Sequence, residues 1–93
     1  MIIKIDDLFI NLNLVRLFRF TAETTSNRQF HRLYFNTEAS GHIICTVNGS
    51  CESVEEFVTE LEKMLLEMLR QGMTVFDVAG YALKLRAQND KLS

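Results

Sequence analysis

The chain has 93 residues, of which 47% are hydrophobic and 24% are charged. This length allows one small domain with a modest core, and the composition excludes a wholly disordered chain, a collagen-like repeat and a disulfide scaffold. The formal net charge of −2 disfavours a generally basic nucleic-acid binder. We therefore treat residues 1–93 as a single domain.

The first residues, MIIKIDD, do not have the pattern of a signal peptide, because acidic side chains interrupt the apolar stretch that such a peptide needs. No apolar run approaches the roughly 18 residues that cross a bilayer. The sequence thus predicts a cytoplasmic protein without a membrane partner. In that compartment we expect Cys45 and Cys51 to act as small hydrophobic residues and not to form a disulfide.

Short β-rich segments fill the first half of the chain. Residues 2–5 and 8–11 flank Asp6-Asp7, two turn-forming residues that predict a hairpin. Three further segments have the alternation of strands, and they cover residues 14–21, 30–36 and 42–47. The sequence therefore predicts a small antiparallel β-meander of four to five strands over residues 2–47.

The middle of the chain carries turn and cap signals. Asn48-Gly49 is the strongest short hairpin signal in the sequence, and only a stub of strand is expected after it, at residues 50–52. Ser53-Val54-Glu55-Glu56 has the form of a capping box, in which the Ser53 oxygen accepts from the Glu56 amide. This pattern predicts that a helix begins at Ser53.

The second half of the chain predicts two helices. Apolar side chains recur at helical spacing within residues 53–71, and Gly72 is a natural C-terminal cap. Residues 74–88 form the second predicted helix, with Thr74 as its cap, and residues 89–93 form a polar tail. With both helices packed on one face of the sheet, the predicted fold class is α+β.

Strand alternation assigns side chains to the two faces of the predicted sheet. The face toward the helices is expected to carry Val15, Leu17, Leu33 and Phe35. These residues would meet the apolar stripe of the first helix, which consists of Phe57, Leu61, Met64, Leu65 and Met68. The opposite face would carry arginine and aromatic side chains from two strands. One strand supplies Arg16, Phe18 and Phe20, and the other supplies Phe30, Arg32 and Tyr34.

The sequence contains no pattern typical of catalysis, metal binding or cofactor binding. Its histidines and cysteines are His31, His42, Cys45 and Cys51, and the spacing of His42 and Cys45 on a strand directs them to opposite faces. The glutamates of the first helix are typical of a solvated face, and the four glycines form no phosphate-binding loop. We therefore expect a protein that is not an enzyme, binds no metal and carries no cofactor.

The second predicted helix has a broader apolar face than one small subunit can cover. This surplus predicts contact with a second copy of the chain or with another protein, through Val75, Phe76 and Leu83. The Arg/aromatic sheet face adds five candidate contact residues, which are Arg16, Phe18, Phe20, Arg32 and Tyr34. Arginine is common at the rim of protein interfaces. The leading hypothesis is a non-enzymatic interaction or adaptor protein that forms a homodimer.

The alternative hypothesis uses the same Arg/aromatic face to bind single-stranded nucleic acid or to act as a regulatory binder, with bases stacked on the rings and phosphates held by arginine. The negative net charge disfavours this alternative. A helix-turn-helix around Gly72 is disfavoured as well, because Val75, Phe76 and Ala79 would stand where hydrogen-bonding side chains must read the bases.

Overall fold

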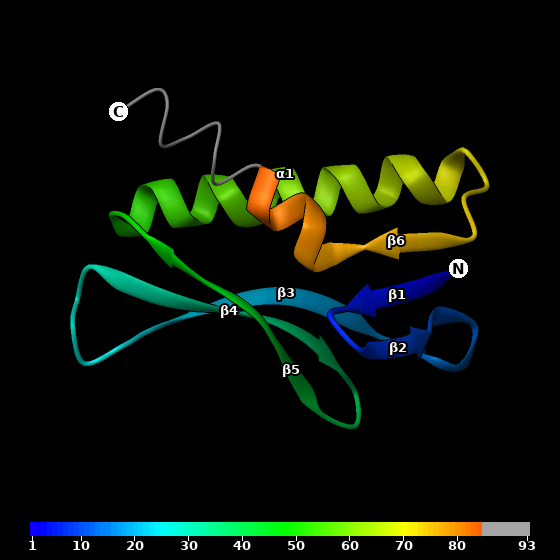
Figure 1. Ribbon diagram of the computed structural model, residues 1–93, viewed down its shortest axis with the longest axis horizontal. Coiled ribbons are helices and arrows are strands. Elements are labelled where there is room, and N and C mark those ends of the chain that lie inside the picture. The colour runs from blue at the N-terminus through cyan, green and yellow to red at the C-terminus, as the bar shows by residue number, and fades with distance from the viewer. Residues whose placement is uncertain (85–93) are drawn as a thin grey trace.

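A computed structural model describes residues 1–84 of the chain. Figure 1 shows two small sheets and a long helix that lies over them. One sheet has the strand order β2-β1-β6 and the other the order β3-β4-β5. The elements in chain order are β1 (Ile2–Ile5), β2 (Leu8–Asn11), the 3₁₀ helix η1 (Leu12–Leu14), β3 (Phe18–Thr24), β4 (Phe30–Thr37), β5 (Gly41–Asn48), α1 (Cys51–Arg70), β6 (Val75–Asp77) and a helical segment at residues 78–84.

The predicted α+β class is confirmed. Strands β3, β4 and β5 form an antiparallel meander of sequential neighbours, and the helices follow it in the chain. The hairpin predicted at Asp6-Asp7 is also present, with Ile5 opposite Leu8. Asp6 has a φ of 51°, a left-handed conformation that Asp tolerates in tight turns.

Residues 75–77 form a strand, and the prediction of a helix beginning at Thr74 is wrong. Strand β6 pairs in parallel with β1, and this pairing places Phe76 opposite Ile3 in the core. The helical segment begins only at residue 78, where Oδ1 of Asp77 accepts the Gly80 N–H at 3.0 Å as an N-terminal cap. Burial of Phe76 against the first strand thus outweighs the local helical pattern. Residues 85–88 of the predicted helix and the predicted tail at 89–93 lie outside the described residues.

The third strand begins at Phe18 and not at residue 14 as predicted. Residues 12–14 instead form η1, which Asn11 caps by accepting the Asn13 N–H at 3.0 Å. Two backbone N–H groups that follow η1 are bound by a side chain from the turn after β4. Glu38 accepts the N–H of Arg16 at 3.0 Å and that of Leu17 at 2.9 Å.

Helix α1 begins earlier than predicted. Ser50 and not Ser53 is its N-cap, and the Ser50 hydroxyl oxygen accepts the Ser53 N–H at 3.3 Å. The chain passes from β5 through Gly49 directly into the helix, so the predicted hairpin at Asn48-Gly49 is absent. Because Ser50 already satisfies a first-turn amide, the two following residues join the helix and form no strand stub.

The C-terminal end of α1 follows the prediction. Gly72 adopts a φ of 76°, which glycine permits without strain. Its N–H reaches the carbonyl of Leu69 at 3.1 Å, and the N–H of Met73 reaches that of Met68 at 3.1 Å. These two bonds form a Schellman motif, which satisfies the last carbonyl groups of the helix.

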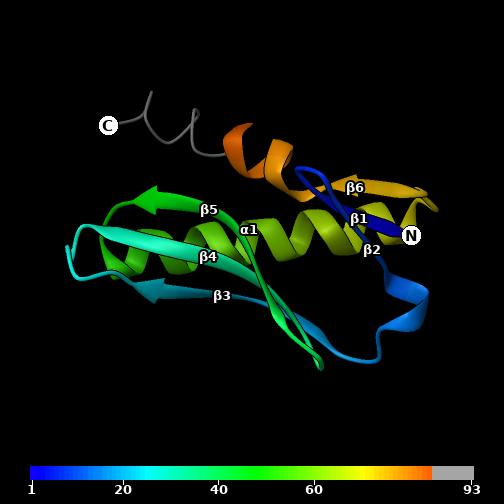
Figure 2. The ribbon, with the colours of Figure 1, turned by 60° about the horizontal axis from the view of Figure 1, so that its bottom comes forward.

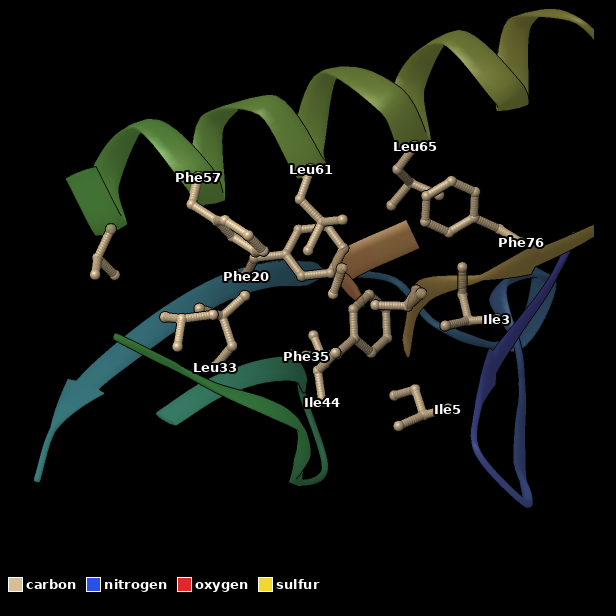
Figure 3. Close-up of a cluster of buried hydrophobic side chains, with 14 residues drawn as sticks. Ile3, Ile5, Phe20, Leu33, Phe35, Ile44, Phe57, Leu61, Leu65 and Phe76 are labelled. Atoms are coloured by element: carbon tan, nitrogen blue, oxygen red, sulfur yellow. The ribbon is translucent and has the colours of Figure 1, made fainter. Parts of the chain in front are cut away.

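The core lies between α1 and the inner faces of both sheets (Figure 3). Leu33 and Phe35 are buried there as predicted, together with Phe57, Leu61 and Leu65 of α1. The prediction that Val15 and Leu17 face the helices is wrong, and Leu17 is 73% exposed. Phe18 and Phe20 take this place on the third strand, because the pairing with β4 sets Phe20 opposite Phe35 on the same face.

Candidate interaction surface

The predicted contact residues do not form one surface. Phe20 and Phe76 are buried, and Phe18 packs on the core with its ring 5.8 Å from that of Phe35. Their side chains therefore stabilise the fold and are not displayed to a partner. The remaining members are separated: Arg16 precedes β3, Arg32 and Tyr34 lie on the outer face of β4, Val75 is exposed on β6, and Leu83 is exposed on the C-terminal helical segment.

The outer face of the meander is tied together by polar side chains. The Tyr34 hydroxyl donates to Glu23 Oε2 at 2.9 Å, and the Asn36 amide donates to Thr21 Oγ1 at 2.6 Å. Both bonds link β3 to β4 on the side away from α1. This face therefore carries a bonded polar network, and Phe18 and Phe20 of the predicted Arg/aromatic face are not part of it.

Strand β3 is an edge strand of its sheet (Figure 2). The N–H of Thr25 bonds the carbonyl of Phe30, so the backbone of Thr25 faces β4. In an antiparallel ladder this orientation alternates along a strand. The outward-facing groups of β3 therefore belong to Phe18, Phe20, Ala22 and Thr24, and they form no hydrogen bond to another part of residues 1–84. We call this row of backbone groups the β3 edge.

A groove of about 440 Å³ runs between the β3 edge and α1. Phe20, Thr21 and Ala22 line it on the strand side. On the helix side it is lined by two apolar residues one turn apart, Val54 and Val58, and by two polar residues beside them, Glu55 and Thr59. The groove thus has an apolar inner part next to unpaired backbone groups, which is the arrangement used when an added strand extends a sheet.

An acidic strip of α1 adjoins this groove. Glu55 and Thr59 also line a second hollow on the solvent side of the helix, together with Glu52, Glu56, Glu60 and Lys63. Because carboxylates repel phosphates, this charge favours a protein partner over nucleic acid at the groove.

The outer face of the other sheet is a second exposed apolar area. Ile2 and Val75 are neighbours on β1 and β6, and Phe9 on β2 lies opposite Lys4. Phe9 is 61% exposed. The apolar side chains exposed on this face come from strands and not from the predicted helix, and they share the face with Lys4, Asn11 and Asp77.

His31 has a structural role. It is 3% exposed, and its ring nitrogens lie 3.2 Å from Thr24 Oγ1 and 3.1 Å from the Gly49 carbonyl oxygen. Within residues 1–84 no three histidine, cysteine or acidic side chains are grouped so that they could hold a metal ion. Cys45 and Cys51 are not bonded to each other, and Cys51 is the first residue of α1.

Glu38 is a charged group whose pKa is shifted by its surroundings. The backbone N–H groups of Arg16 and Leu17 bind the charged carboxylate, and they hold the pKa of Glu38 below its usual value. The ionised side chain thereby fixes the segment before β3 to the turn between β4 and β5.

Comparison with known proteins gives no relative: no family model matches the chain, and neither a curated protein nor a solved structure matches it significantly. Among residues 1–84, no helix has both the length and the apolar character needed to cross a membrane.

The sequence analysis did not predict the β3 edge, because the order of strands in a sheet decides which strand lies at its edge. Strand alternation does place Arg19, Thr21 and Glu23 on one face of β3, but it does not indicate whether the strand lies at an edge.

Proposed function

We propose that this protein acts through protein contacts, as a small non-enzymatic interaction protein of the cytoplasm that associates with itself. The β3 edge carries the proposal, since it presents backbone donors and acceptors that no other group of residues 1–84 pairs, and they lie beside an apolar groove. Natural proteins protect edge strands of this kind or use them for pairing. The two cysteines, which are not bonded to each other, are compatible with a reducing compartment.

The exposed apolar side chains of the other sheet support the same function. Ile2 and Val75 are direct neighbours on this exposed face, and Phe9 lies on the same face, opposite Lys4. Grouped apolar residues on a small domain are typical of surfaces that bind another protein.

Light scattering across a wide concentration series, at low and at high salt, tests this function. We expect a species of twice the chain mass of 10.8 kDa. Pairing of strands and apolar surfaces should persist at high salt, whereas nucleic-acid binding would weaken steeply through counterion release. A monomer at every concentration would overturn the proposed self-association.

A further inference from the structure

We propose that two copies of the chain pair through the β3 edge, antiparallel, with Thr21 of one copy opposite Thr21 of the other. The two three-stranded meanders would then form one continuous six-stranded sheet. This inference rests on the proposed function and names its partner and its surface. The backbone pattern of β3 permits this register, and the charges on its outer face select it.

The backbone pattern of β3 fits the register. Antiparallel strands exchange hydrogen bonds at positions where the backbone N–H and C=O groups of both residues point toward the other strand. With Thr21 on the two-fold axis, Phe20 lies opposite Ala22 of the second copy, and Phe18 lies opposite its Thr24. All four of these residues have outward-facing backbone groups, so the full length of both strands would be paired.

Charge complementarity selects this register over its neighbours. On the outer face, Arg19 of each copy lies opposite Glu23 of the other, at a position where facing side chains are close. A register centred on Arg19 would set two arginines opposite each other, and one centred on Glu23 would set two glutamates opposite each other. Registers centred on Phe20 or Ala22 leave both charges without a partner and pair fewer residues. The Thr21 register alone combines opposite charges with complete overlap.

Glu23 is oriented for this contact within its own chain. Its Oε2 atom accepts the Tyr34 hydroxyl at 2.9 Å, so the side chain is held over the outer face of the sheet. A carboxylate has two oxygens and can accept further hydrogen bonds while this one is kept. The guanidinium of Arg19 from the second copy can therefore bind the same carboxylate.

The groove beside α1 provides space on the inner face. There the register sets the large Phe20 beside the small Ala22 of the second copy, and Ala22 is exposed in the single chain. Val54 and Val58 form the apolar side of this space. Large and small side chains would thus alternate across the new interface, which permits close packing.

A charge exchange tests the register directly. In the register centred on Thr21, R19E sets two carboxylates opposite each other across the interface, and E23R sets two guanidinium groups opposite each other. Each variant should raise the dimer dissociation constant by on the order of ten-fold or more, because two opposite-charge contacts become repulsive at once. The double variant R19E/E23R should recover most of the affinity, and a mixture of the two single variants should form the heterodimer preferentially.

Two more variants complete the experiment, with dissociation constants measured by analytical ultracentrifugation and folding checked by circular dichroism. R28E makes the same charge change as R19E in the exposed loop before β4, and it should leave the dimer intact. A22P removes an outward N–H that forms no hydrogen bond within residues 1–84, and it should abolish the dimer while the monomer stays folded.

The outcomes separate this inference from the proposed function. If the chain is dimeric but R19E, E23R and A22P leave its mass unchanged, the β3 register is wrong and self-association proceeds through another surface. If the single variants dissociate and the double variant does not recover, the Arg19–Glu23 pairing is refuted. A wild-type monomer at all concentrations would overturn both proposals.

Discussion

The Nε2 atom of His31 lies 3.1 Å from the carbonyl oxygen of Gly49, which follows β5 and precedes Ser50, the N-cap of α1. A carbonyl oxygen can only accept, so Nε2 is the donor of this bond. On its other side the ring meets the Thr24 hydroxyl at the end of β3. This buried side chain thus holds the end of one strand and the start of the helix at a fixed separation.

Replacement of His31 by leucine should destabilise the fold. The variant keeps an apolar group of similar size but loses both hydrogen bonds, at a cost of about 1–3 kcal/mol in the free energy of unfolding. His42→Leu is the matched control, because the His42 ring bonds Ser40 in an exposed turn. Urea denaturation measures both variants, and equal losses would contradict the structural role assigned to His31.

Leu61 and Leu66 test the orientation of α1. Leu61 is fully buried against the sheets, whereas Leu66 is 60% exposed on the same helix. Leu61→Ala should cost about 2–5 kcal/mol, since it removes buried methyl groups and leaves a cavity. Leu66→Ala should change stability by less than about 0.5 kcal/mol. Urea unfolding of the two variants gives the comparison, and a small loss for Leu61→Ala would refute the assignment of the core face.

The lowered pKa of Glu38 predicts a pH-dependent stability. Because the folded-state pKa lies below the unfolded one, the ionised carboxylate stabilises the fold at neutral pH, and this contribution is lost as the pH falls through the folded pKa. Glu38→Gln should therefore be less stable than the wild type at neutral pH, and the difference should shrink in acid. Thermal unfolding across a pH series measures this, with Glu56→Gln on α1 as a control for the loss of one charge. A difference that stays constant with pH would contradict the role of the carboxylate.

Asp77 and Thr74 distinguish the observed helix cap from the one that the sequence suggests. Asp77→Ala removes the acceptor of the Gly80 N–H and should cost about 1 kcal/mol, whereas Asp77→Asn should keep most of the stability. Thr74→Ala should have a small effect, since Thr74 precedes β6 and caps no helix. Chemical denaturation of the three variants checks this order, and a larger loss for Thr74→Ala would favour the helix that begins at residue 74.

Features that depend on neighbouring residues could be predicted from the amino-acid order. The apolar spacing of α1, its glycine cap at Gly72 and the hairpin at Asp6-Asp7 were predicted correctly, because each is stabilised within a few residues of chain. The α+β order of strands followed by helices came from the same local patterns. The start of α1 was misplaced by two residues, since two serines could each act as the cap and the path from β5 selects Ser50.

Contacts between distant segments selected which strand pairs with which and which face of a strand is buried. The segment Val75–Asp77 has a helical pattern, but pairing with β1 buries Phe76 and makes the segment a strand. On β3, the register with β4 turns Phe18 and Phe20 inward, so the predicted Arg/aromatic surface is not assembled. A shift of the register by one residue moves every side chain of a strand to the other face of the sheet. The residues next to the strand in the sequence therefore do not determine which face is buried. Tertiary structure also decides that β3 has an open edge, because a strand lies at the edge of a sheet only when a neighbouring strand pairs with one side of it and not with the other.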